Sequence, residues 1–171
     1  MSKNLNKILQ HGDFKQKRRI NSRSKGNRFE RKIAKLLNER FETKEFCRTP
    51  GSGAFGTTHT SLPTHIKVHG DLITPEKFRF VVECKSGYKV ELDDLFKKDS
   101  QFWKFIAQAK RDSETANKPW ILIYEKTRRK AIVVTEEKIR LKNRVTLPGN
   151  CYMYTLEEFL KLPIDRFYEG V

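Results

Sequence analysis

"HGDLITPEKFRFVVECK", residues 69–85, contains two short apolar runs separated by a Pro-Glu-Lys turn, with Asp71, Glu83 and Lys85 set among the apolar residues. Because the side chains of a strand alternate between the two faces of a sheet, residues 78–85 divide into two sets. The apolar set is Phe78, Phe80, Val82 and Cys84, and the other set is Arg79, Val81, Glu83 and Lys85. The pattern predicts a strand with one core face and one face that carries a site.

A hairpin over this stretch would bring two acidic side chains together. If residues 68–74 pair with residues 78–85, Asp71 falls directly opposite Glu83, with Cβ atoms roughly 4.5–5.5 Å apart. Two carboxylates at that separation repel each other and lose hydration, so the pair costs stability unless a cation neutralises it. Carboxylate oxygens, with a backbone carbonyl and water, are the ligands that Mg²⁺ or Mn²⁺ prefers. Lys85 on the same face would orient or deprotonate an attacking water, or offset charge that develops on a phosphate.

The same spacing also arises by chance. In that case Asp71 and Glu83 are solvent-facing residues of an edge hairpin, and Lys85 is their salt-bridge partner. Three features favour a site: the chain is strongly basic, the opposite face of the strand is apolar, and a further acidic residue, Glu30, lies on the preceding predicted helix.

That helix is predicted over residues 25–40. Its apolar residues recur at helical spacing, and Ser22 or Ser24 is available as an N-cap; the apolar positions are Phe29, Ile33, Leu36 and Leu37. Glu30 lies at the edge of this apolar stripe, a position compatible with a carboxylate that points into a cleft.

The rest of the chain alternates further strands and helices. Gly, Ser, Thr and Pro residues make 49–64 a long loop. The expected elements are a strand at 44–49, a helix at 99–115, a hairpin of 119–125 with 131–135 around the basic tip KTRRK, a strand at 151–154, and a helix from Thr155 with a Thr155–Glu158 capping box. This order predicts a mixed α/β domain with a sheet flanked by helices.

The charge of the chain predicts a polyanionic partner. Thirty-six Lys and Arg against 21 Asp and Glu give a formal net charge of +15 over 171 residues. Nucleic acid is the leading candidate, because a basic protein gains free energy when it releases the counterions condensed on phosphates. No segment combines a basic face with a bulky apolar face, so a membrane partner is not expected. Residues 1–24 are read as a basic arm and residues 25–171 as the folded domain.

Other kinds of site find little support in the sequence. Cys47, Cys84 and Cys151 form no C-x-x-C pair, so neither a zinc ribbon nor a disulfide framework is indicated and a cytoplasmic location is expected. The alternative of a zinc site built from Cys47 and the histidines 59, 65 and 69 matches no familiar ligand spacing. No phosphate-binding P-loop is present, so ATP use is not expected.

Five segments taken together resemble the PD-(D/E)XK nuclease superfamily, and within it the small Holliday junction resolvases of archaea and phages. The segments are KGNRFER (25–31), RTPGSGA (48–54), HGD (69–71), ECK (83–85) and FWKFIAQAKR (102–111). The resemblance implies a restriction-endonuclease-like mixed sheet flanked by helices, Mg²⁺-dependent cleavage of phosphodiesters with Mn²⁺ as a substitute, and a homodimer. Gly70 departs from the pattern, because the superfamily name has Pro there.

The resemblance also implies roles for individual residues. The catalytic residues would be Glu30, Ser52, Asp71, Glu83, Lys85 and Gln108. The metal would be held by Glu30, Asp71, Glu83 and Cys84. Arg31 and Arg48 match phosphate-contacting positions of the family. Apart from the resemblance, Arg23 and Lys25 at the basic arm and Arg128 and Arg129 in the KTRRK tip are candidate contacts to nucleic acid, and the tip is equally well explained as a solvated hairpin turn. We therefore expect a metal-dependent DNA endonuclease that is selective for branched DNA. The alternatives are a linear-duplex, nicking or repair endonuclease of the same fold, and a non-catalytic basic nucleic-acid-binding protein.

Overall fold

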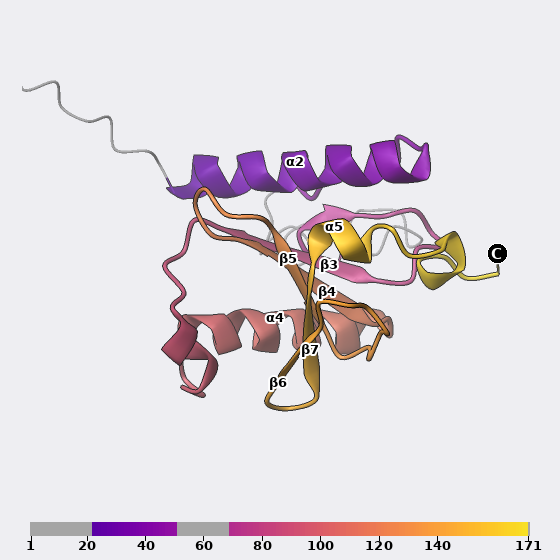
Figure 1. The fold of residues 1–171 in the computed structure, drawn as a ribbon. Coiled ribbons are helices and arrows are strands. Elements are labelled where there is room, and N and C mark those ends of the chain that lie inside the picture. Colours follow the sequence, from indigo (N-terminus) through magenta and orange to yellow (C-terminus); the bar gives the residue numbers. More distant parts are fainter. Residues whose placement is uncertain (1–21, 51–68, 171) are drawn as a thin grey trace, which may run out of the picture.

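A five-stranded sheet lies between two long helices in the computed structural model, which describes residues 22–50 and 69–170 (Figure 1). Helix α2 (Ser22–Phe41) covers one face of the sheet and helix α4 (Gln101–Ala116) covers the other. The architecture is the expected mixed sheet flanked by helices of a restriction-endonuclease-like fold.

The sheet is mixed because one of its strand pairs is parallel. Its strands, in spatial order, are β3 (Val81–Ser86), β4 (Trp120–Glu125), β5 (Ile132–Thr135), β7 (Cys151–Thr155) and β6 (Val145–Leu147). Strands β3 and β4 run parallel and are connected through α4, whereas the other neighbours are antiparallel. A separate two-stranded sheet pairs β1 (Cys47–Arg48) with β2 (Leu72–Ile73). The short helices are η1 (Leu92–Leu95), α5 (Leu156–Phe159) and η2 (Ile164–Arg166).

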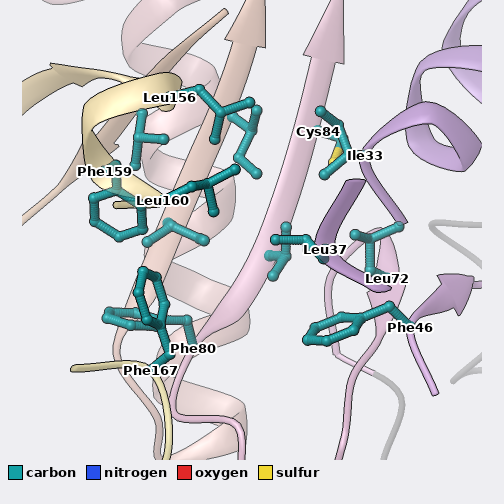
Figure 2. Packing of buried hydrophobic residues seen from close by; sticks show 14 of the residues in the cluster. Ile33, Leu37, Phe46, Leu72, Phe80, Cys84, Leu156, Phe159, Leu160 and Phe167 are labelled. Carbon is teal, nitrogen blue, oxygen red and sulfur yellow. The ribbon is translucent and has the colours of Figure 1, made fainter. Parts of the chain in front are cut away.

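Helix α2 forms where the apolar periodicity predicts it. Phe29, Ile33 and Leu37 recur every fourth residue, and each is at most 4% exposed. They belong to the same core cluster as Val82 and Cys84, the apolar face of β3; Figure 2 shows Ile33 and Leu37 beside this strand. Burying each such side chain contributes about 1.5–3 kcal/mol, which fixes α2 across the strand that carries the candidate site.

Helix α4 packs against the opposite face through Phe102, Phe105, Ile106 and Ala109. Glu83, on the face of β3 opposite Val82 and Cys84, is therefore covered as well, and none of it is exposed. Both faces of β3 are thus buried, and a charged side chain occupies a place that would suit Val or Ile.

The predicted hairpin of residues 68–74 with 78–85 is wrong. Strand β2 pairs instead with β1, with Ile73 opposite Cys47, so residues 44–49 provide the partner that the sequence did not indicate. The two segments are joined by one backbone–backbone hydrogen bond, from Asp71 N–H to Val82 O at 2.9 Å, and by a second from Cys84 N–H to the Asp71 side chain. Strand β3 is an edge strand of its sheet, and these hydrogen bonds still bring Asp71 alongside Glu83.

Several local predictions can also be compared with the structure. The helix begins at Ser22 rather than at residue 25, so Ser22 and Ser24 lie inside it and neither is its N-cap. The predicted capping box is confirmed in part: Thr155 Oγ1 accepts a hydrogen bond from Glu158 N–H, while Glu158 Oε2 accepts one from the Thr155 hydroxyl. Strand β6 was not expected, since Val145 and Thr146 are exposed and lack an alternating pattern. No helix in the described ranges is long and apolar enough to span a membrane.

Candidate active site

Strand β3 supplies the two innermost charged residues of the site. Glu83 is fully buried, and Lys85, two residues later on the same face, has a side chain that is 15% exposed. The Lys85 ammonium forms an ion pair with Glu83 Oε1 and lies 3.6 Å from Asp71 Oδ2. It also lies 5.8 Å from the centre of the Phe105 ring of α4, which confines it to this side of the sheet. One cation is thus shared between two carboxylates.

Asp71 is held in place by two hydrogen bonds to β3. Its backbone N–H donates to Val82 O, and its Oδ2 accepts from the backbone N–H of Cys84, both at 2.9 Å. The preceding residue, Gly70, has φ +75°, and a Cβ there would lie 2.6 Å from Val82 O. Proline cannot adopt a positive φ, so this backbone explains why Gly stands where the superfamily name has Pro. Glycine is what allows the chain to approach β3 closely enough to place Asp71.

Helix α2 adds a third carboxylate. Glu30 is 6% exposed, and its Oε2 accepts a hydrogen bond of 2.5 Å from Nε of Arg48 in β1. The Arg48 side chain is itself mostly buried, at 18% exposure. The structure therefore pairs a residue expected to hold metal with a residue expected to contact DNA.

The negative charge of the cluster is only partly compensated. Burial, together with repulsion from Asp71, raises the pKa of Glu83 to about 8 although Lys85 acts in the opposite direction. Burial and the charge of Asp71 also raise the pKa of Glu30, against the effect of Arg48. Burial alone would lower the pKa of Lys85, but Glu83 and Asp71 outweigh it and the pKa is raised. These directions indicate a place where a further cation would be stabilising.

The residues present fit a divalent metal ion. In the part of the chain that the structure describes, the buried Glu83 carboxylate is contacted by the Lys85 ammonium at Oε1, and its Oε2 has no hydrogen-bond partner. A buried carboxylate oxygen without a partner is costly, and a hard cation would satisfy it. Within residues 22–50 and 69–170, no three Asp, Glu, His or Cys side chains already stand in a metal-binding arrangement. Lys85 would therefore have to give up its position between Asp71 and Glu83.

Cys84 can contribute only through its backbone. Its side chain points to the opposite face of β3, into the core that α2 covers, and burial raises the pKa of its thiol well above the usual value. A thiol in that environment stays protonated and is a poor ligand, so the carbonyl oxygen is the group that this residue offers.

A cleft of about 570 Å³ opens beside the cluster. Its walls come from the start of α2, the end of β3 and the middle of α4; they include Arg23, Lys25, Glu30, Asp71, Cys84, Lys85, Tyr88 and Gln108. A larger groove of about 840 Å³, between α2 and α5, contains none of the expected catalytic residues. We place the site in the smaller cleft because Glu30, Asp71 and Lys85 line it.

The remaining expected residues lie around this cleft or outside it. The Lys25 ammonium donates to Thr127 Oγ1 at 3.1 Å, which joins the start of α2 to the turn between β4 and β5. Arg128 and Arg129 are exposed on that turn, and Arg31 is exposed on α2 without lining the cleft. Ser52 lies outside the described residues, as do His59 and His65.

Asp112 is a fourth carboxylate that the sequence analysis missed. It is half-buried on α4, and burial together with the charge of Asp71 raises its pKa. Asp112 also contributes to the raised pKa of Glu83. It follows Gln108 by four residues, so both side chains lie on the same face of the helix. That spacing was the available signal.

Comparisons with known proteins identify the family of the chain. The family described as "Phage putative PDDEXK endonuclease" matches residues 21–161. Protein D14 of Escherichia phage T5 is 30% identical over 115 residues, which make up 64% of this chain and 67% of that protein. No solved structure matches the chain significantly. Because the family model spans most of the sequence, the expected membership in the PD-(D/E)XK superfamily is confirmed. The chain belongs to the PDDEXK family of phage endonucleases.

Proposed function

We propose that the chain is a metal-dependent DNA endonuclease that hydrolyses phosphodiester bonds and is selective for branched DNA. The observation that carries this proposal is the fully buried Glu83 carboxylate beside Asp71, whose Oε2 has no hydrogen-bond partner among the described residues. A stable protein seldom retains such a group without a ligand for it. Membership in an endonuclease family supplies the class of reaction.

Asp71 and Glu83 are the proposed metal ligands, with Glu30 as a third carboxylate and the Cys84 carbonyl as a neutral oxygen. Mg²⁺ fits this all-oxygen set, and Mn²⁺ is expected to substitute for it. When bound, such an ion polarises the phosphate and lowers the pKa of a water molecule.

Lys85 is the proposed catalytic lysine. If a metal ion took the position of Lys85 between the carboxylates, the Lys85 ammonium would be free to orient the attacking water or to offset charge on the phosphate. Gln108 lines the same cleft and is proposed to assist at the bound strand. The expected contribution of Ser52 stays a prediction.

Six basic residues are the proposed DNA contacts, and two of them, Arg23 and Lys25, line the cleft. The six are Arg23, Lys25, Arg31, Arg48, Arg128 and Arg129, and they would bind phosphates rather than base edges. Contacts of this kind recognise the path of the DNA backbone rather than its base sequence, which supports branched DNA as the substrate class. A homodimer is the proposed assembly, and sedimentation velocity would measure it.

The assignment is tested by Asp71→Asn and Glu83→Gln. Each is expected to abolish nicking of a supercoiled plasmid in Mg²⁺ while the affinity for DNA is kept, because neither residue is a phosphate contact. Glu39→Gln is the control, since Glu39 is exposed on α2 outside the cleft and should cleave like the wild type. Full activity in either cleft variant would contradict the site.

The substrate class is tested separately, with a four-way junction and the linear duplexes of its arms. Faster cleavage of the junction supports the proposal, and equal rates would favour a linear-duplex or nicking enzyme. Binding without strand breaks, in Mg²⁺ and in chelator alike, would favour a non-catalytic binding protein.

A further inference from the structure

Exposed apolar side chains gather in the segment that follows the catalytic strand. Among the described residues, five large hydrophobic side chains are strongly exposed, and three of them lie within residues 88–96. They are Tyr88 at 46%, Leu92 at 77% and Phe96 at 79%, which we call the apolar tip. The other two, Val145 and Ile164, lie in separate parts of the chain. Such a concentration beside a cleft is typical of an interaction site.

The apolar tip is held in position by hydrogen bonds from neighbouring elements. Tyr124 Oη of β4 donates to the Tyr88 carbonyl at 2.8 Å, and Lys126 Nζ donates to Val90 O at 3.1 Å. Trp103 Nε1 of α4 donates to Leu95 O at 3.0 Å. Val90 and Leu95 pack against the core beneath α4. The exposure of Leu92 and Phe96 is therefore a consequence of a defined backbone that turns these two side chains outward.

The charged residues of this segment neutralise one another. Asp93 forms an ion pair with Lys97, and Glu91 forms one with Lys126 at 3.1 Å. Asp94 Oδ2 accepts a hydrogen bond from the Glu91 N–H and so closes the η1 turn. A chain with a net charge of +15 thus presents an apolar tip with balanced charge, next to a cleft whose walls carry both basic and acidic residues.

The tip is continuous with the candidate active site. Tyr88 lines the cleft together with Lys85, and η1 follows it along the chain. Figure 1 shows η1 projecting from the body of the molecule, between the end of β3 and the start of α4. DNA that reaches the carboxylates would therefore pass this segment.

We propose that Leu92 and Phe96 form a wedge that packs against bases where the duplex opens, so that the tip reads unpaired or splayed bases at a branch. This inference rests on the proposed nuclease function and deepens it. Apolar side chains between base steps unstack them, and an aromatic ring can stack on a freed base irrespective of sequence. Contacts to phosphates distinguish an open duplex from a closed one less directly than contacts to the bases do.

A second copy of the chain is the competing occupant. Stable protein interfaces bury roughly 800 Å² from each partner, and two neighbouring side chains supply only part of that area. The continuity of the tip with the cleft favours DNA, and the oligomeric state decides between the two.

The test compares Leu92→Ser/Phe96→Ser with the matched control Val145→Ser/Ile164→Ser, which removes exposed apolar side chains elsewhere. Binding is measured without divalent metal on a four-way junction that carries 2-aminopurine at the branch point, and on a linear duplex. The wild type and the control are expected to raise the 2-aminopurine fluorescence as the base unstacks. The tip variant should lose that rise and bind the junction at least about fivefold more weakly, with linear affinity changed less than about twofold. Phe96→Trp should retain the wild-type affinity for the junction.

Two results would overturn the wedge. The first is a tip variant whose fluorescence rise and junction affinity equal those of the wild type. If the wild type still cleaves DNA, this result leaves the proposed function intact. The second is a tip variant that sediments as a monomer, although the wild type sediments as a dimer, and that loses affinity for both DNAs equally. This result would show that the tip contacts a second copy of the chain. A wild-type protein that binds neither DNA overturns the wedge and the proposed function together.

Discussion

Glu83 is a single residue whose burial lowers the stability of the metal-free fold. Its carboxyl is fully buried beside Asp71, and its pKa is raised to about 8 by burial and by that neighbour. Lys85 offsets this only in part. Residues that destabilise the fold in this way are common at functional sites, where a ligand supplies the missing compensation.

We predict that Glu83→Gln stabilises the metal-free protein near pH 8 and raises its Tm by a few degrees. For a chain of this size, each kcal/mol of added unfolding free energy raises Tm by about 2–4 °C. The folded chain keeps a proton on Glu83 up to about pH 8, whereas the unfolded chain releases it near the usual value of 4.5. The stability of the wild type therefore falls as the pH rises between these values, while Gln has no such proton to lose. The gain should vanish below about pH 4.5.

Thermal unfolding in EDTA at a series of pH values measures this effect. Mn²⁺ should then raise the Tm of the wild type more than that of Glu83→Gln, because a ligand that binds only the folded state stabilises it. A variant that is less stable than the wild type at pH 8 in EDTA would contradict the electrostatic account.

Arg48 is predicted to compete with the metal for Glu30. Its Nε lies 2.5 Å from Glu30 Oε2, so a metal that used this oxygen would have to displace the guanidinium. Arg48→Gln should therefore bind Mn²⁺ at least about threefold more tightly in the absence of DNA, since an unpaired buried carboxylate gains more from a cation. Its affinity for DNA should fall, because a proposed phosphate contact is lost. Isothermal titration with Mn²⁺ and fluorescence anisotropy with DNA measure the two effects.

Arg79→Gln is the matched control for Arg48→Gln. Arg79 also forms a part-buried ion pair, with Glu137 at 2.8 Å, but it does not line the cleft. Its loss should lower stability and leave Mn²⁺ affinity unchanged. Equal or weaker Mn²⁺ binding by Arg48→Gln would show that the pair does not compete with the metal.

At the scale of elements, Gly70 controls how the chain approaches β3. Its φ of +75° and the 2.6 Å that would separate a Cβ from Val82 O exclude a side chain unless the backbone shifts. We predict that Gly70→Ala costs at least about 3 kcal/mol, the sum of left-handed strain and steric overlap. Because the shift would also move Asp71, Mn²⁺ affinity should fall. Urea unfolding measures the cost.

Gly149→Ala separates the two contributions. Gly149 has a similar φ of +69°, but no atom lies within 4 Å of the position of its Cβ. Only the backbone strain remains there, and it should cost about 1 kcal/mol. If the two alanine variants lose equal stability, the close approach to Val82 is not what requires glycine at position 70.

Elements with strong internal patterns were predictable from the sequence, and pairings between distant segments were not. The stripe of Phe29, Ile33 and Leu37 defines α2, and the β-branched runs define β4 and β5. The pairing of β2 with β1 could not be predicted, since two-residue strands have no periodicity and their partners are separated by residues 49–71. A hairpin was the shortest connection, but Gly70 and the Asp71 side chain occupy the edge of β3 instead.

The candidate site was predictable to the same degree. Alternation along β3 identified Glu83 and Lys85 as members of one face, and the structure places Asp71 beside them. The pairing of Glu30 with Arg48 could not be read from the sequence, because the two residues meet only after α2 and β1 have packed. Asp112 was not identified from the sequence, because an Asp on a helix is usually exposed to solvent and its burial is known only from the structure.

At the scale of the whole molecule, the excess of positive charge is distributed over the chain rather than confined to the cleft. Residues 1–19 hold six Lys and Arg and one Asp, so their removal would lower the net charge from +15 to +10. The core clusters of the described residues draw on α2, the sheet, α4 and the C-terminal segment. Folding and DNA affinity should therefore respond differently to the loss of the N-terminal residues.

We predict that removing residues 1–19 changes the free energy of unfolding by no more than about 0.5 kcal/mol. The shortened chain should bind DNA more weakly than the full chain. Each phosphate contact contributes about 0.9 to the slope of log K against log salt, so the slope should become shallower by at least about 2. Anisotropy titrations at several salt concentrations measure it. The full-length chain with Lys15, Lys17, Arg18 and Arg19 changed to Gln keeps the length but not the charge, and it should show most of the same loss. An unchanged slope in both proteins would show that the basic arm takes no part in binding and that the positive charge of the remaining chain suffices.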